Sequence, residues 1–125
     1  MIFLFLPLIY SCSTHLQPNE PVENTMRFEK DDADTYDIIV LDPQYDFYLK
    51  SMAQPENFYS EQYYKTKNDS YVLEWNLRYN QPQRYDANFY STYIDYNPQT
   101  EYGLHFEYKL YNFFKFIEWK YNVKL

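Results

Sequence analysis

Cysteine and histidine offer the most versatile chemistry in this sequence, and the chain has few of them. Cys12 is its only cysteine, and His15 and His105 are its only histidines. One cysteine cannot form an internal disulfide, and the spacing of these three residues matches no zinc-binding pattern. Nucleophilic catalysis needs a base beside the nucleophile. His105 could be such a base, but no sequence pattern pairs it with a nucleophile. A pair of carboxylates could still hydrolyse a sugar bond, but nothing selects two of the 18 acidic residues. We therefore expect no metal or other cofactor, and no enzyme activity.

The run that precedes Cys12 is the clearest targeting signal. Residues 1–11 are almost entirely apolar. They are too few to span a membrane, which takes about 20 apolar residues, and are typical of the hydrophobic region of a secretory signal. Residues 9–12 resemble a lipobox, where a signal peptidase cuts before a cysteine that carries a diacylglycerol anchor. We expect Cys12 to be lipidated and to hold the protein at a membrane. The alternative is a buried N-terminal strand with a free thiol.

The most distinctive polar stretch is residues 80–86, Asn-Gln-Pro-Gln-Arg-Tyr-Asp. We expect Arg84 at its centre, because a planar guanidinium can hold a carboxylate in two bonds and Asp86 is close. The loop could grip an anionic or sugar ligand, or it could be a hydrogen-bonded corner that fixes a helix to the next strand. We favour the corner. The candidate residues are Asn80, Gln83, Arg84, Tyr85 and Asp86.

Composition and charge exclude several classes of function. Aromatic residues make up 23% of the chain, so we expect a core built from rings. Gly103 is the only glycine, which excludes the glycine-rich phosphate cradles of nucleotide-binding folds. The net charge of −7 argues against nucleic acid as a partner, because phosphate backbones repel an acidic surface.

The length of 125 residues predicts one domain with tails. Residues 12–35 contain few large apolar side chains and an acidic run at 29–34, so we expect an acidic, disordered tether. Three aspartates of that run could be read as calcium ligands, but the glycine and distal glutamate of an EF-hand loop are absent. We therefore divide the chain into a signal segment at 1–11, the tether at 12–35 and one α+β domain at 36–125.

The first half of that domain predicts one strand and two helices. Residues 36–41 are apolar and β-branched, as in a covered strand. Asp42 and Pro43 then predict the start of a helix that ends near residue 53. We expect Phe47, Leu49 and Met52 to face the core from it, with Tyr45 and Tyr48 beside them. A second helix is predicted over residues 60–79, with a possible break at 68–70. Its inward residues would be Val72, Trp75 and Tyr79, and Glu74 would pair with Arg78.

The second half predicts a strand, a turn and the main core helix. Residues 89–96 alternate weakly, as in a strand with rings on both faces, and 97–100 form a turn. Over residues 102–121 the apolar side chains recur every three or four residues, as in a helix. The first part, 102–110, also alternates and could instead be a strand. The expected core stripe is Phe106, Leu110, Phe113, Phe114, Ile117 and Tyr121, and the expected polar side holds His105, Lys109, Asn112 and Lys120. The fold class is α+β, a small sheet of a few strands covered by two or three aromatic-rich helices.

Several segments match a known family. They are the loop at 80–86, Asp-Tyr-Asn-Pro at 95–98, Tyr-Gly at 102–103, Leu-Tyr-Asn-Phe-Phe at 110–114 and Lys-Tyr-Asn at 120–122. Over roughly residues 36–125 the sequence resembles the small uncharacterised lipoproteins of Bacteroidota known as domain of unknown function 6146. The resemblance implies a cell-envelope location and the same domain layout, and it brings no activity. Surface-export signals of that phylum place acidic residues after the lipidated cysteine. Residues 13–16 are Ser-Thr-His-Leu, which favours an outer-membrane lipoprotein that faces the periplasm.

These observations favour a binding role over catalysis. Tyrosine and tryptophan are enriched at binding hot spots, so we expect a structural or adaptor lipoprotein that binds another envelope protein. The alternative is a glycan-binding module with exposed Tyr and Trp rings. A coplanar row of exposed rings near carboxylates and Arg84 would favour sugar, whereas a compact ring patch with a polar rim would favour protein.

Overall fold

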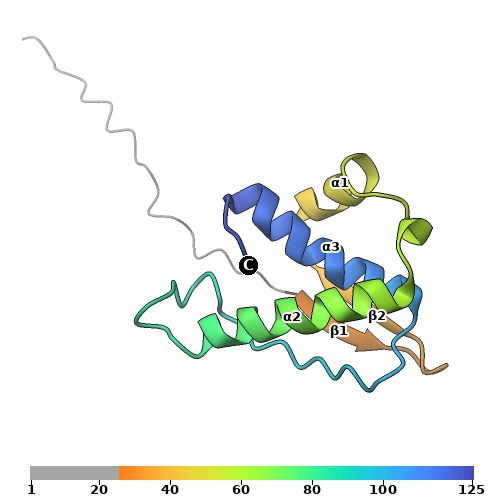
Figure 1. Ribbon diagram of the computed structural model, residues 1–125, viewed down its shortest axis with the longest axis horizontal. Helices are drawn as coiled ribbons and strands as arrows, with labels where there is room; N and C mark the ends of the chain where they lie inside the picture. Colours follow the sequence, from red (N-terminus) through yellow and green to blue (C-terminus); the bar gives the residue numbers. More distant parts are fainter. Residues whose placement is uncertain (1–25) are drawn as a thin grey trace, which may run out of the picture.

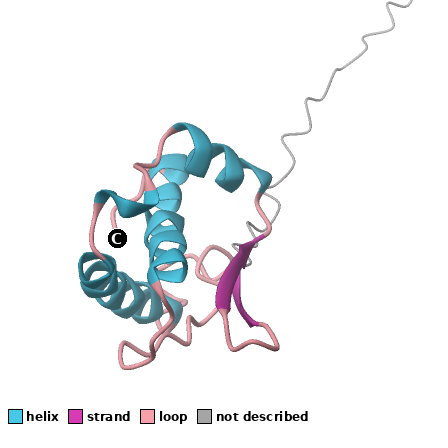
Figure 2. Cartoon of the chain, turned by 90° about the vertical axis from the view of Figure 1, so that its right-hand side faces the viewer, coloured by secondary structure: helices cyan, strands magenta, loops and turns pink. Residues whose placement is uncertain are grey.

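The computed structural model of the chain describes residues 26–125, which fold as a hairpin against a layer of helices (Figure 1). Figure 2 shows the hairpin on one side of that layer. Helix α3 packs on α2, α1 and β2, so it lies at the centre of the core. The α+β prediction is confirmed. The elements are β1 (Met26–Lys30), β2 (Tyr36–Val40), α1 (Pro43–Ser51), the short 3-10 helix η1 (Glu56–Phe58), α2 (Glu61–Tyr79) and α3 (Leu104–Tyr121).

Strand β2 confirms the predicted strand, and β1 pairs with it in antiparallel register, with Met26 opposite Val40. The prediction of a disordered tether over residues 12–35 is therefore wrong for residues 26–35. Met26 and Phe28 alternate with charged residues, and the Phe28 ring packs 4.8 Å from that of Phe106 in α3. One apolar face is enough to order the strand. Residues 1–25, with the predicted signal segment and the rest of the tether, lie outside the described residues.

Helix α1 begins at the predicted cap. The Asp42 carboxylate accepts a hydrogen bond from the Gln44 N–H at 3.0 Å. The predicted inward face is wrong in part, because Phe47 is 56% exposed and Met52 47% exposed. Tyr45 and Tyr48, three residues apart, are buried instead. The Tyr45 hydroxyl donates to the Lys109 carbonyl at 2.7 Å, so a polar bond to α3 selects which face turns inward.

Helix α2 is continuous, and the predicted break near residues 68–70 is wrong. The Asn68 side chain points into the core, where its amide donates to the Glu107 carbonyl at 2.9 Å. Val72 and Trp75 are buried as predicted, whereas Tyr79 is 39% exposed. The side-chain nitrogen of this apparent helix breaker is thus bonded to α3, whereas its buried side-chain oxygen has no hydrogen-bond partner among residues 26–125.

Helix α3 supplies most of the core. It begins after Gly103, whose φ of 93° suits glycine, and it ends at Asn122 in the left-handed region. The five residues of its predicted stripe from Phe106 to Ile117 are buried, so that prediction is confirmed and the alternative strand at 102–110 is wrong. Asn112, expected on the polar side, is also buried, because its amide donates to the Tyr108 carbonyl within the helix.

The predicted strand at residues 89–96 is wrong, although its alternating burial is real: Ile94 and Tyr96 are buried and Tyr93 and Asp95 exposed. No strand pairs with it among residues 26–125. Instead the Asn76 side chain bonds both the N–H and the C=O of Ile94, each at 2.9 Å. The predicted turn that follows is confirmed by the bond from the Thr100 N–H to the Asn97 carbonyl.

Candidate functional site

The predicted functional residues divide between a region outside the described structure and one corner of the fold. Cys12, the predicted lipidation site, lies outside residues 26–125, and no helix within that range has the length and apolar character needed to cross a bilayer. Residues 80–86 follow the C-terminal end of α2 and form successive turns, in which the N–H groups of Arg84 and Tyr85 donate to Gln81. The Asp86 carboxylate accepts from the Asn88 N–H at 2.8 Å. Asn80, Gln83, Arg84 and Asp86 are exposed, and Tyr85 is half-buried.

The prediction that Arg84 is the centre of this corner is wrong, because Arg78 makes the hydrogen bonds that hold the corner together. Arg78 donates to Glu74 at 2.8 Å, which confirms the predicted pair, and also to the Tyr90 hydroxyl and to the Lys124 carbonyl, both at 2.7 Å. Its guanidinium lies over the Tyr85 ring at 5.1 Å and the Tyr90 ring at 5.5 Å. Arg84 only lies over the Tyr85 ring, at 5.4 Å. The corner joins α2, the loop and the C-terminal residues; its use as a ligand site stays a prediction.

A buried carboxylate, which sequence reasoning missed, lies where α2 meets α3. Glu107 is fully buried. Its carboxylate accepts from the Tyr96 hydroxyl at 3.0 Å and from the Asn68 amide at 2.8 Å. Burial raises the pKa of Glu107 despite these donors. The one sign in the sequence that Glu107 would be buried is its place between two aromatic residues, Phe106 and Tyr108.

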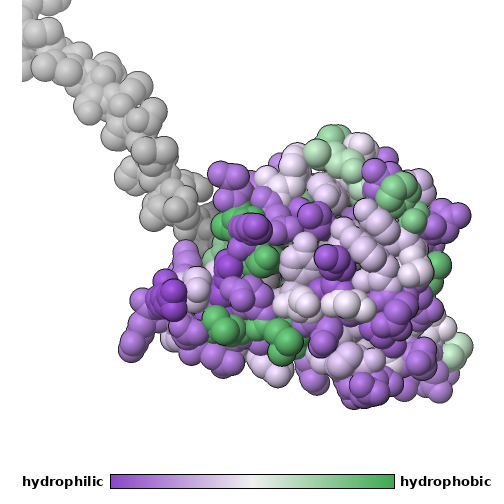
Figure 3. Space-filling model, viewed as in Figure 1, coloured by the Kyte–Doolittle hydropathy of each residue, from purple (hydrophilic) through white to green (hydrophobic). Residues whose placement is uncertain are grey.

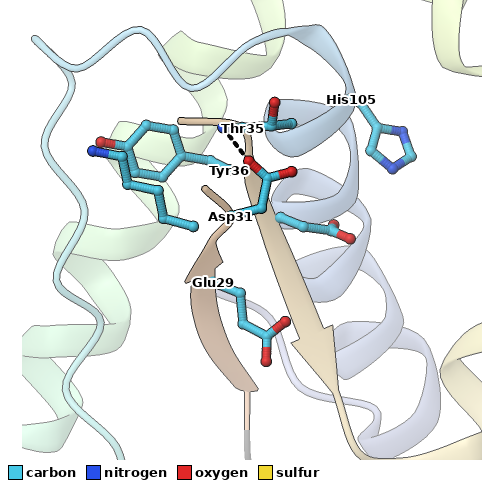
Figure 4. Close-up of a pocket in the computed structure, with 7 residues that line it drawn as sticks. Glu29, Asp31, Thr35, Tyr36 and His105 are labelled. Atoms are coloured by element: carbon cyan, nitrogen blue, oxygen red, sulfur yellow. Dashed lines mark hydrogen bonds between the residues drawn. The ribbon is translucent and has the colours of Figure 1, made fainter. Parts of the chain in front are cut away.

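One pocket lies beside the hairpin turn and has a volume of about 570 Å³ (Figure 4). Its charges are already engaged. Partial burial opposes ionisation of Asp37, but Lys109 at 2.8 Å lowers its pKa. His105 lies apart from the hairpin carboxylates in Figure 4 and bonds Glu56 at 2.7 Å. Within residues 26–125, no three His, Cys, Asp or Glu side chains are placed to hold a metal ion. The lining residues are Glu29, Lys30, Asp31, Thr35, Tyr36, Asp37 and His105.

A smaller cavity of about 100 Å³, here called the tyrosine slot, lies between the end of α1, η1, α2 and α3. Hydroxyl groups fix two of its rings: Tyr64 donates to the Glu56 carbonyl at 3.0 Å and Tyr108 to the Gln54 carbonyl at 2.7 Å. Ring faces form much of its wall, and Gln54, Asn112 and Lys115 add polar groups, so the slot is lined by both apolar and polar surface. Its lining residues are Tyr48, Met52, Ala53, Gln54, Tyr59, Tyr64, Tyr108, Tyr111, Asn112 and Lys115.

The rim of the slot is hydrophobic and exposed. Met52 belongs to its lining and is 47% exposed, and Phe58, 55% exposed, packs 4.7 Å from the ring of Tyr59. Tyr59 also stacks on Tyr63 at 4.0 Å, and Lys67 lies over the Tyr63 ring at 5.6 Å. The slot and rim therefore form a compact patch of rings with polar neighbours. Sequence reasoning missed this patch, since its rings come from four separate elements; the one local signal was the two ring pairs that flank Ser60.

The chain was compared with protein families, curated proteins and solved structures. A family model described as a family of unknown function (DUF6146) matches residues 1–125, the whole chain. Neither the curated proteins nor the solved structures include a match to the chain. What the tyrosine slot does must therefore be argued from its own geometry.

Proposed function

The chain belongs to the family of unknown function DUF6146, and we propose that it is an adaptor lipoprotein of the cell envelope. It would bind another envelope protein through the tyrosine slot. The observation that carries this proposal is the combination of a slot lined by five tyrosine rings with two exposed hydrophobic residues, Met52 and Phe58, at its rim. Exposed hydrophobic surface beside a pocket is typical of an interaction site.

The size of the slot supports a protein partner. Pockets for small molecules usually measure about 300–1,000 Å³. The slot, at about 100 Å³, is smaller and suits one inserted side chain. Protein interfaces commonly place such an anchor residue in a pocket and surround it with contacts that exclude water. Met52 and Phe58 are placed to make those surrounding contacts.

The arrangement of the rings favours protein over glycan. A sugar platform needs coplanar exposed rings, but Tyr64 and Tyr108 meet at 74° and Phe58 and Tyr59 at 89°. Arg84, which a sugar site was expected to use, follows the opposite end of α2 from the slot. A glycan is therefore the alternative occupant that the experiment below must distinguish.

The envelope location rests on Cys12 and on the resemblance to Bacteroidota lipoproteins. We expect Cys12 to carry the lipid and the domain to face the periplasm from the outer membrane. Metabolic labelling with a radioactive fatty acid should label the wild-type chain but not Cys12→Ala; label retained in the variant would contradict the anchor. A tagged copy should resist protease in intact cells and be digested after permeabilisation, whereas digestion in intact cells would indicate surface display.

Crosslinking in cells tests the binding role. A photo-crosslinking phenylalanine analogue in place of Phe58 should capture a discrete protein after irradiation. The matched control is the same analogue in place of Leu73, which is 66% exposed on the outer side of α2, where Figure 3 shows further hydrophobic surface. Capture from position 58 alone supports the adaptor. Equal capture from both positions, or a protein-free adduct that a glycosidase removes, would contradict it.

A further inference from the structure

A second groove, of about 230 Å³, follows the edge of β1 that faces away from β2. One wall is made by Met26, Arg27 and Phe28, and the other by residues 92–95. Successive side chains of a strand point to opposite faces, so a groove lined by three consecutive residues runs along the edge of the strand. In Figure 4 the segment that leads into α3 runs on the side of β1 away from β2.

The backbone of β1 offers to this groove hydrogen-bonding groups that have no partner among residues 26–125. The N–H of Ile38 donates to the Asp37 carboxylate and its carbonyl accepts from Lys109, each at 2.8 Å, so both groups point away from β1. Phe28 is the residue opposite Ile38. In an antiparallel pair that exchanges no backbone bonds, the N–H and C=O groups of both residues point outward. Those of Phe28 therefore face the groove.

The opposite wall, made by residues 92–95, also has backbone groups that face the groove. Ile94 turns its N–H and C=O towards α2, where Asn76 binds both. The backbone groups of neighbouring Tyr93 have no hydrogen-bond partner among residues 26–125. Adjacent residues of an extended chain direct these groups to opposite sides, so those of Tyr93 point away from α2. Within the part of the chain that the structure describes, backbone groups without a partner thus line both walls of one groove, which is the arrangement that accepts an added strand.

We propose that this groove binds an extended segment of a partner protein, which adds a strand between β1 and residues 92–95. Met26 and Ile94 are buried apolar residues of the two walls, so alternate side chains of the segment should be apolar. Arg27 and Asp95, one on each wall, are exposed and opposite in charge. The side chains between should therefore be acidic where they face Arg27 and basic where they face Asp95. This surface is separate from the tyrosine slot and does not depend on its proposed role.

A peptide titration tests the proposal. The full chain carrying Cys12→Ala and labelled with ¹⁵N is mixed with acetyl-Thr-Val-Glu-Val-Lys-Val-Thr-amide. We expect amide exchange at Phe28 and Tyr93 to slow at least tenfold at saturation. The same peptide N-methylated at alternate residues cannot donate to one wall and should bind at least tenfold more weakly. Equal binding of both peptides, no change at Phe28 and Tyr93, or changes confined to Tyr59 and Tyr111 would each overturn the proposal.

A proline variant tests the far wall with little risk to the fold, because Tyr93 is 53% exposed. Tyr93→Pro removes the N–H and should weaken peptide binding about tenfold, whereas Tyr93→Ala keeps the N–H and should bind within about twofold of the parent. Similar losses in both variants would mean that the side chain is what matters. If the Phe28 amide exchanged more slowly at higher protein concentration in the absence of peptide, a second copy of the chain would be filling the groove. Either result would overturn strand addition by a partner.

Discussion

At the C-terminal end of α2 the rings of Tyr85 and Tyr90 pack around Arg78, whereas at its N-terminal end the rings of Tyr59 and Tyr64 line the tyrosine slot. Both clusters are rich in tyrosine. In the first, a guanidinium covers ring faces and donates to three partners, so the surface is closed. In the second, tyrosine hydroxyls bond backbone carbonyls, and within residues 26–125 no arginine lies over the rings that line the slot. An arginine thus closes the first cluster, whereas the second keeps a slot between its rings.

Loss of Arg78 should produce the largest effect. Arg78→Ala removes three hydrogen bonds of a charged group whose side chain is only 15% exposed. Bonds to charged groups contribute about 1.5–3 kcal/mol each and are not additive, so we expect a loss of about 3 kcal/mol. Chemical denaturation measures it. The matched control is Arg84→Ala, which should stay within about 0.5 kcal/mol of wild type. A loss at Arg84 equal to that at Arg78 would restore Arg84 as the centre of the corner.

Removing one tyrosine hydroxyl at each end compares the two clusters directly. Tyr90→Phe loses a 2.7 Å bond from a guanidinium and should cost about 2 kcal/mol, whereas Tyr64→Phe loses a neutral bond to the Glu56 carbonyl and should cost about 1 kcal/mol. Thermal unfolding of both variants measures the difference. If Tyr64→Phe proved the more destabilising, the slot would be as structural as the corner.

Glu107 lies between the two ends and should make stability depend on pH. Burial raises its pKa in the folded state above the unfolded value. Its contribution is therefore fully present below the unfolded pKa and is lost as the pH rises through the folded pKa. Glu107→Gln should remove this loss and stabilise the fold at neutral pH by about 1 kcal/mol.

Thermal unfolding of wild type and Glu107→Gln from acidic to neutral pH tests the sign. Their difference should widen as the pH rises. A constant difference would mean that Glu107 does not titrate in this range. Tyr96→Phe is the companion variant, because it removes a donor to the carboxylate and should make the loss of stability with pH steeper.

Local patterns predicted most elements, and tertiary partners explain the failures. The cap at Asp42 and the apolar stripe of α3 depend on neighbours within a few residues, so the sequence revealed them. The ordering of β1 depends on Phe106, far away in the chain. The strand predicted at residues 89–96 failed because the side chain of Asn76, and no strand, binds the backbone of Ile94. The tyrosine slot and the burial of Glu107 need side chains from several elements, which no local pattern can bring together.

The central position of α3 has a consequence for how the chain folds. It is the last element in sequence order, yet β2, α1 and α2 all pack on it. Proteins are made from the N-terminus at about 5–20 residues per second. The earlier elements therefore wait for α3 before they can bury their apolar faces, and the chain stays open while it emerges. A protein that must cross a membrane unfolded would gain from this order, because its core cannot close too early.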